Sequence, residues 1–102
     1  MARYQIMSWH GIPTGVKAED EKGQVRENLP KRFQVAVDAV ATAVGRVDTK
    51  EYLAGWQWSD PLEREGSARQ VAKLVAAELD QSFSPGRVKE LRQALEQTLS
   101  SK

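Results

Sequence analysis

Short runs in which hydrophobic and polar residues alternate make up the first third of the chain. Arg3–Trp9 alternates throughout and is predicted to form the first strand. His10–Gly15 is dense in turn residues and is expected to close that strand. Two weaker runs, Val16–Glu19 and Gln24–Leu29, flank a charged loop that ends at Gly23. They predict a hairpin with polar strands, of which at least one is expected to lie at a sheet edge.

Tyr52–Trp58 is the run around which we expect the rest of the fold to be organised. Tyr52, Trp56 and Trp58 would share one face of an extended chain. Large aromatic residues at alternate positions are typical of a half-buried strand, so a further strand is predicted here. A short turn of helix near residues 48–52 is expected to lead into it. Ser59–Pro61 follows, and because proline lacks a backbone donor, pairing is expected to end there.

Three other segments carry apolar residues three and four positions apart, which predicts helices. The first is expected to begin at Pro30 and to end near Gly45, and the second to begin after Ser67 as its N-cap. Ser84 and Pro85 are suited to begin a third helix, whose apolar stripe is Val88, Leu91, Leu95 and Leu99.

The element order β-β-β-α-β-α-α predicts an α+β fold with two layers. We expect a small, antiparallel-rich sheet of about four strands with helices packed on one face. Residues 1–83 are predicted to form a single domain, and residues 84–102 a C-terminal helix appended to it.

Composition narrows the possible functions. The 102 residues include 15 basic and 14 acidic side chains, so the net charge of +1 gives no general attraction to nucleic acid or anionic membrane. Cysteine is absent, which excludes disulfides and cysteine-ligated metal sites. No catalytic motif, cofactor motif, signal peptide or long apolar run is found, so we expect a cytoplasmic protein that is not an enzyme and needs no cofactor or metal.

Four stretches of the chain form a recognisable combination: Tyr4–Pro13, Asn28–Asp38, Tyr52–Trp58 and Arg64–Ser67. Among them the Leu-Pro-x-Arg-Phe and Tyr-Leu-x-x-Trp patterns are fairly specific. Together they resemble the small bacterial domain family known as "virulence factor". The resemblance covers about residues 4–83. Related sequences also occur joined to helical-repeat and scaffold segments, so the resemblance implies an accessory or assembly role rather than a particular reaction.

Exposed tryptophans are the first candidate for a binding site. Trp56 and Trp58 on one strand face, together with Trp9, would provide an aromatic platform for a base, a ring or a proline. The competing interpretation places Trp56 and Trp58 in the core between sheet and helices, as large aromatic residues usually are.

Basic residues give a second candidate. Lys31 and Arg32 occupy the first turn of the first predicted helix, where free backbone amides bind anions, although a solvated helix start would look the same. His10 is the only histidine, and as a turn residue beside Gly11 it is either a binding residue or a structural one.

Three classes of function remain. The first is a non-catalytic accessory module that binds a protein partner through the aromatic strand or the last helix, with a homodimer through residues 84–102 as one possibility. The second is a module that binds nucleic acid or an anionic ligand through exposed tryptophans with Lys31 and Arg32, although the near-neutral charge argues against nucleic acid. The third is an accessory subunit of an enzyme complex.

Overall fold

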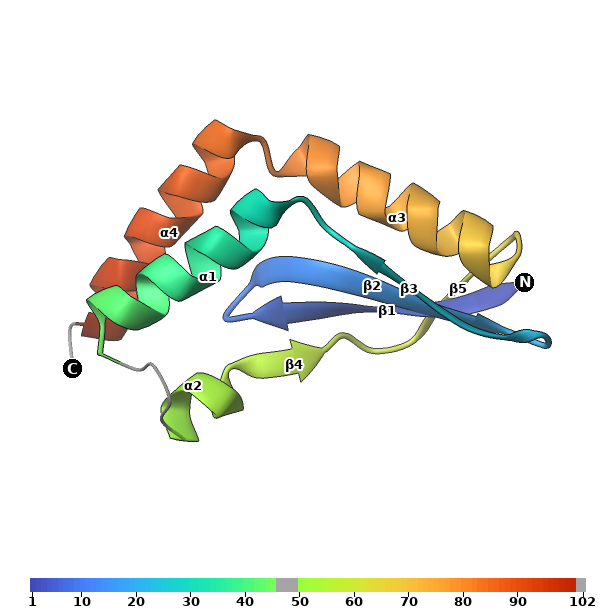
Figure 1. Ribbon diagram of the computed structural model, residues 1–102, viewed down its shortest axis with the longest axis horizontal. Coiled ribbons are helices and arrows are strands. Elements are labelled where there is room, and N and C mark those ends of the chain that lie inside the picture. The colour runs from blue at the N-terminus through green and yellow to red at the C-terminus, as the bar shows by residue number, and fades with distance from the viewer. Residues whose placement is uncertain (46–49, 101–102) are drawn as a thin grey trace.

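A five-stranded antiparallel sheet with three long helices on one side forms the domain (Figure 1). The computed structural model describes residues 1–45 and 50–100. The strands are β1 (Ala2–Trp9), β2 (Ile12–Asp20), β3 (Gly23–Asn28), β4 (Trp56–Trp58) and β5 (Leu62–Arg64). The helices are α1 (Lys31–Ala43), α2 (Lys50–Ala54), α3 (Ala68–Ser82) and α4 (Pro85–Ser100). The α+β fold with an antiparallel sheet is therefore confirmed.

The sheet order is β3-β2-β1-β4, and β5 also pairs with β1. The edge position predicted for one hairpin strand belongs to β3. β4 and β5 pair with the two ends of the same strand, β4 with Met7–Trp9 and β5 with Ala2–Tyr4. The strand that begins at Trp56 ends before Ser59–Pro61, as predicted, but pairing with β1 resumes at Leu62, which the sequence had not predicted. Ser59 links the two short strands, because its backbone N–H donates to the Ile6 carbonyl over 2.9 Å and its hydroxyl accepts from the Ile6 N–H over 2.8 Å.

The β1–β2 turn is shorter than predicted. His10 and Gly11 both have positive φ, 47° and 90°, the conformation that two-residue hairpin turns favour. Ile12–Gly15 therefore belongs to β2 and not to the turn. Met7 pairs with Gly15 and Ser8 with Pro13, so Thr14 is an extra residue in β2. Ile12 consequently pairs with Trp9.

The helical turn expected to lead into the aromatic strand extends further than predicted and replaces the first half of that strand; residues 48 and 49 of the expected turn lie outside the described residues. Residues 50–54 form α2, and only Trp56–Trp58 is extended. Lysine, leucine and alanine at positions 50, 53 and 54 are good helix formers, and a two-residue period over so few positions does not exclude a helical turn. Leu53 points into solvent and is 68% exposed.

The long helices begin largely where the sequence predicts. Pro30 precedes α1 as its N-cap rather than as its first helical residue. Ser67 caps α3 in a reciprocal capping box with Gln70, and the Ser84 hydroxyl accepts from the Arg87 N–H at the start of α4. α3 packs on β1, β2 and β3, whereas α4 packs on α1. Figure 1 shows α1, α3 and α4 on one side of the strands, with α2 beside β4 on the other side of this view.

The core combines the inner face of the sheet with the apolar sides of the helices. The largest fully buried side chains are Trp9, Phe33, Ile12, Val16, Val37, Val40 and Val71. The stripe of α4 also packs on this core, with Val88 buried and Leu91, Leu95 and Leu99 partly buried. This stripe therefore packs within the chain. The predicted homodimer through residues 84–102 stays untested, and residues 101–102 lie outside the described residues.

Candidate functional site

The face of the sheet turned away from α3 carries the candidate site. Residues that pair directly across strands share a face, and successive residues alternate between faces. Ala2, Val16 and Ala18 are buried on the α3 side. The opposite face therefore carries one row made of Trp58, Met7, Gly15 and Asn28, and a second row made of Gln5, Lys17 and Arg26.

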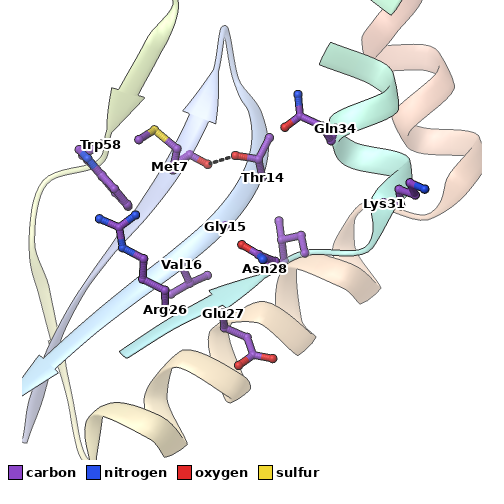
Figure 2. A pocket seen from close by; sticks show the side chains of 11 residues that line it. Met7, Thr14, Gly15, Val16, Arg26, Glu27, Asn28, Lys31, Gln34 and Trp58 are labelled. Carbon is purple, nitrogen blue, oxygen red and sulfur yellow. Dashed lines mark hydrogen bonds between the residues drawn. The ribbon is translucent and has the colours of Figure 1, made fainter. Parts of the chain in front are cut away.

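A pocket of about 470 Å³ lies over Gly15, where the first row has no side chain. Figure 2 shows Met7 and Trp58 on one side of Gly15 and Asn28 on the other, with Lys31 and Gln34 projecting from the first turn of α1. The complete lining is Met7, Thr14, Gly15, Val16, Arg26, Glu27, Asn28, Leu29, Lys31, Gln34 and Trp58. The sequence analysis had singled out two of these residues, Trp58 and Lys31.

Two cations lie against the ring of Trp58. The Lys17 ammonium is 4.2 Å and the Arg26 guanidinium carbon 5.7 Å from the ring centroid. Both distances fall within the range in which a cation is attracted by the π electrons of an aromatic ring. In Figure 2 the Arg26 side chain extends toward Trp58. Trp58 is thus half-buried and holds cations, so it is not a free platform on which a base can stack.

The pocket is electropositive. Arg26 and Lys31 contribute basic groups, and Lys17 adds a third beside Trp58. Glu27 is the acidic residue of the lining, but it pairs with Val16, on the α3 side of the sheet. Figure 2 shows its carboxylate pointing away from Gly15. An anionic group in this pocket would therefore face cations from two strands and one helix.

Arg32 has a structural role, in contrast to the prediction that it joins Lys31 in an anion site. Its Nη2 donates to the backbone carbonyls of Asp80 and Phe83 over 2.9 and 2.8 Å, and it forms an ion pair with the Asp80 carboxylate. These carbonyls belong to the last turn of α3 and the residue after it, where helix hydrogen bonding ends. Arg32 thereby fastens the start of α1 to the end of α3, while Lys31 stays exposed.

Trp9, His10 and Trp56 form a separate aromatic cluster with Tyr52. Trp9 is 0% exposed and its indole N–H donates to the Tyr52 carbonyl over 2.8 Å. The expectation of an exposed ring at Trp9 is therefore wrong, because α2 covers it. The His10 ring meets Trp9 edge to face at 4.6 Å, and the Trp56 ring meets Tyr52 edge to face at 6.1 Å. His10 and Trp56 are both half-buried at this cluster.

No group of three or more histidine, cysteine, aspartate or glutamate side chains that could hold a metal ion occurs within residues 1–45 and 50–100. None of the helices described is long and apolar enough to cross a membrane. The pocket presents cationic, amide and apolar groups.

Comparison with known proteins identifies one family. A family model described as "virulence factor" matches residues 7–91. The match runs from the middle of β1 into α4, beyond the residue 83 at which the sequence resemblance had ended. No significant match was found among curated proteins or among solved structures.

Proposed function

The chain belongs to the virulence factor family, and we propose that it is a small non-catalytic module that binds a partner protein on the open face of its sheet. The observation that supports this proposal most directly is the composition of the sheet face turned away from α3. α3 covers the other face of the sheet, and the open face presents Trp58, Lys17 and Arg26 around a pocket that the start of α1 also lines. Tryptophan and arginine are enriched in protein interfaces, where they provide much of the affinity.

An accessory role in a larger assembly fits this proposal, including one as a subunit of an enzyme complex. In either case the partner would occupy the open face. A cytoplasmic location and the absence of catalytic activity remain predictions of the sequence.

Affinity capture from an extract of the source cells tests the proposal. The wild-type chain is compared with Arg26→Glu and Trp58→Ala, which alter the open face, and with Arg69→Glu, which reverses a charge on the exposed side of α3. We expect one stoichiometric protein that the wild type and Arg69→Glu retain and that both open-face variants lose. Equal retention by all four chains would refute the proposal, provided that each variant has the circular dichroism spectrum of the wild type.

Binding of an anionic ligand or nucleic acid is the second candidate, and the three cations near the pocket favour it. Titration with inorganic phosphate and with a thymidine oligonucleotide, followed by tryptophan fluorescence, tests it directly. Nucleic-acid binding would weaken steeply as salt concentration rises, because counterions are released from the phosphates. An unchanged fluorescence signal at low salt would exclude this candidate.

A further inference from the structure

Gly15 is the unexplained residue of the open face. A glycine inside a strand destabilises the strand relative to alanine, so a structural reason is normally expected. Gly15 does not have the positive φ of Gly11, and a Cβ built on it would meet its nearest atom, the Glu27 carbonyl oxygen, at 3.4 Å. Neither the backbone nor the packing therefore requires glycine here. The consequence of the missing side chain is the hollow between Met7 and Asn28.

The floor of this hollow is suited to an apolar side chain. Met7 and Trp58, both half-buried, contribute apolar surface beside Gly15. An apolar side chain placed there would remove this surface from water, which favours binding. The backbone carbonyl of Glu27 and the amide of Asn28 lie at the same end of the pocket, within 4 Å of the position a Cβ would take.

The charges around the hollow indicate which residues of a partner would flank that apolar side chain. Arg26 and Lys31 line the hollow and Lys17 lies beside it at the Trp58 ring, whereas Glu27 extends toward the other side of the sheet. A segment with carboxylates on both sides of an apolar residue would place negative charges opposite these cations, and such complementarity determines which partners bind. The Trp58 ring is 4.2 Å from the Lys17 ammonium and Trp9 is buried, so neither ring is free to stack on a base at this pocket.

We propose that the Gly15 pocket binds a short acidic segment of the partner protein, with one apolar side chain seated over Gly15 and flanking carboxylates opposite Lys17, Arg26 and Lys31. This inference rests on the proposed function and specifies the chemistry of its partner.

A defined peptide tests the inference without knowledge of the partner. The probe is a fluorescein-labelled octapeptide with four glutamates around a central leucine. Two matched peptides carry glycine in place of leucine or glutamines in place of glutamates, and a thymidine octanucleotide tests for nucleic acid. Fluorescence anisotropy with the full chain is expected to show that the glutamate–leucine peptide binds at least about tenfold more tightly than any of the three, a difference of about 1.4 kcal/mol.

Substitutions in the chain locate the binding. Gly15→Val fills the hollow and leaves the charges unchanged, whereas Arg26→Glu reverses one charge. Each substitution is expected to lower the affinity for the glutamate–leucine peptide about tenfold. Arg69→Glu is the matched control and should bind as the wild type does. Gly15→Ala is the second variant for the hollow in case valine disturbs the sheet, and an unchanged thermal melting temperature shows that a variant is folded.

The outcomes separate this inference from the proposed function. Equal binding of the glutamine peptide, unaltered binding to folded Gly15→Val, or preference for the oligonucleotide would overturn the acidic-segment assignment. A captured partner that depends on Arg26 while no acidic peptide binds would also overturn it, yet would leave the proposed function standing. If the open-face variants capture the partner as well as the wild type does, the proposed function itself is refuted.

Discussion

At the scale of single residues, Gly55 is required for the aromatic cluster to close. A Cβ at this position would lie 2.5 Å from Trp9 Nε1 and 2.8 Å from His10 Nε2. These atoms belong to rings that pack edge to face, and Trp9 has no room to move because it is fully buried. The indole would have to shift away from the Tyr52 carbonyl that accepts its hydrogen bond.

Gly55→Ala should therefore destabilise the fold, by about 1–3 kcal/mol as expected for overpacking in a core. Chemical denaturation followed by tryptophan fluorescence measures the change. Gly86→Ala is the matched control, since a Cβ there meets nothing within 4 Å and alanine suits the first turn of α4. The account of the cluster is contradicted if Gly55→Ala and Gly86→Ala unfold at the same denaturant concentration.

The sequence distinguishes poorly between the three tryptophans. Trp9 alternates with Met7 and Gln5 on a predicted strand, and nothing in that pattern shows that α2 will cover one end of the face. Trp58 lies on the same face and stays half-buried, because Lys17 and Arg26 cover its ring instead. The burial of each tryptophan depends on which element packs over it, and the residue type alone does not determine this.

At the scale of elements, Arg32 and Lys31 are neighbours with separate roles. Arg32 donates to Asp80 and Phe83 and so joins α1 to α3, whereas Lys31 is exposed at the pocket. Arg32→Met should lower the free energy of unfolding by about 1–3 kcal/mol, because charged hydrogen bonds to α3 are lost. Lys31→Met should leave the free energy of unfolding nearly unchanged and lower the affinity for the acidic peptide.

Thermal denaturation and peptide anisotropy on the same two variants provide the measurement. Each variant is the control for the other, since both remove one positive charge within the same helical turn. The division of roles is wrong if Lys31→Met destabilises the chain as much as Arg32→Met does.

Helix starts were predictable because their determinants are local. The hydroxyls of Ser67 and Ser84 cap their helices by accepting from backbone N–H groups only three residues away. Pro30 ends the preceding strand, because proline has no backbone N–H to donate to a neighbouring strand. The pocket was not predictable in the same way. It depends on the register that brings Trp58, Met7, Gly15 and Asn28 into one row, and on Thr14 as an extra residue in β2. Such long-range pairing has no signature within any one stretch.

At the scale of the whole molecule, Asp20 joins distant parts of the fold. Its carboxylate accepts from the Ala68 N–H at the start of α3 and from the Lys22 N–H in the β2–β3 turn, each over 2.8 Å. The hydrogen bond from Ala68, followed by that from Lys22, lowers the pKa of Asp20 below its ordinary value of 3.8. The ion pair with Arg64 likewise lowers the pKa of Glu78 on α3 below 4.5.

A lowered carboxyl pKa in the folded state determines the direction of the pH effect. As pH falls, the unfolded chain takes up the proton first, so protonation favours unfolding. The stability that Asp20 contributes is therefore complete above about pH 4 and is lost as pH falls through the lower, folded-state pKa. Because Asp20 connects the hairpin to α3, its loss should loosen the contact between the sheet and its helical layer.

Urea denaturation at a series of pH values from 7 to below 3 tests this connection. The unfolding midpoint of the wild type should decrease below about pH 4, and that of Asp20→Asn should start lower at pH 7 and decrease less steeply, because the carboxylate is already absent. Glu21→Gln removes the same charge from the exposed neighbour in the turn and should keep the wild-type profile. If Asp20→Asn and the wild type keep a constant difference in midpoint down to the lowest pH, the Asp20 carboxylate does not couple the hairpin to α3.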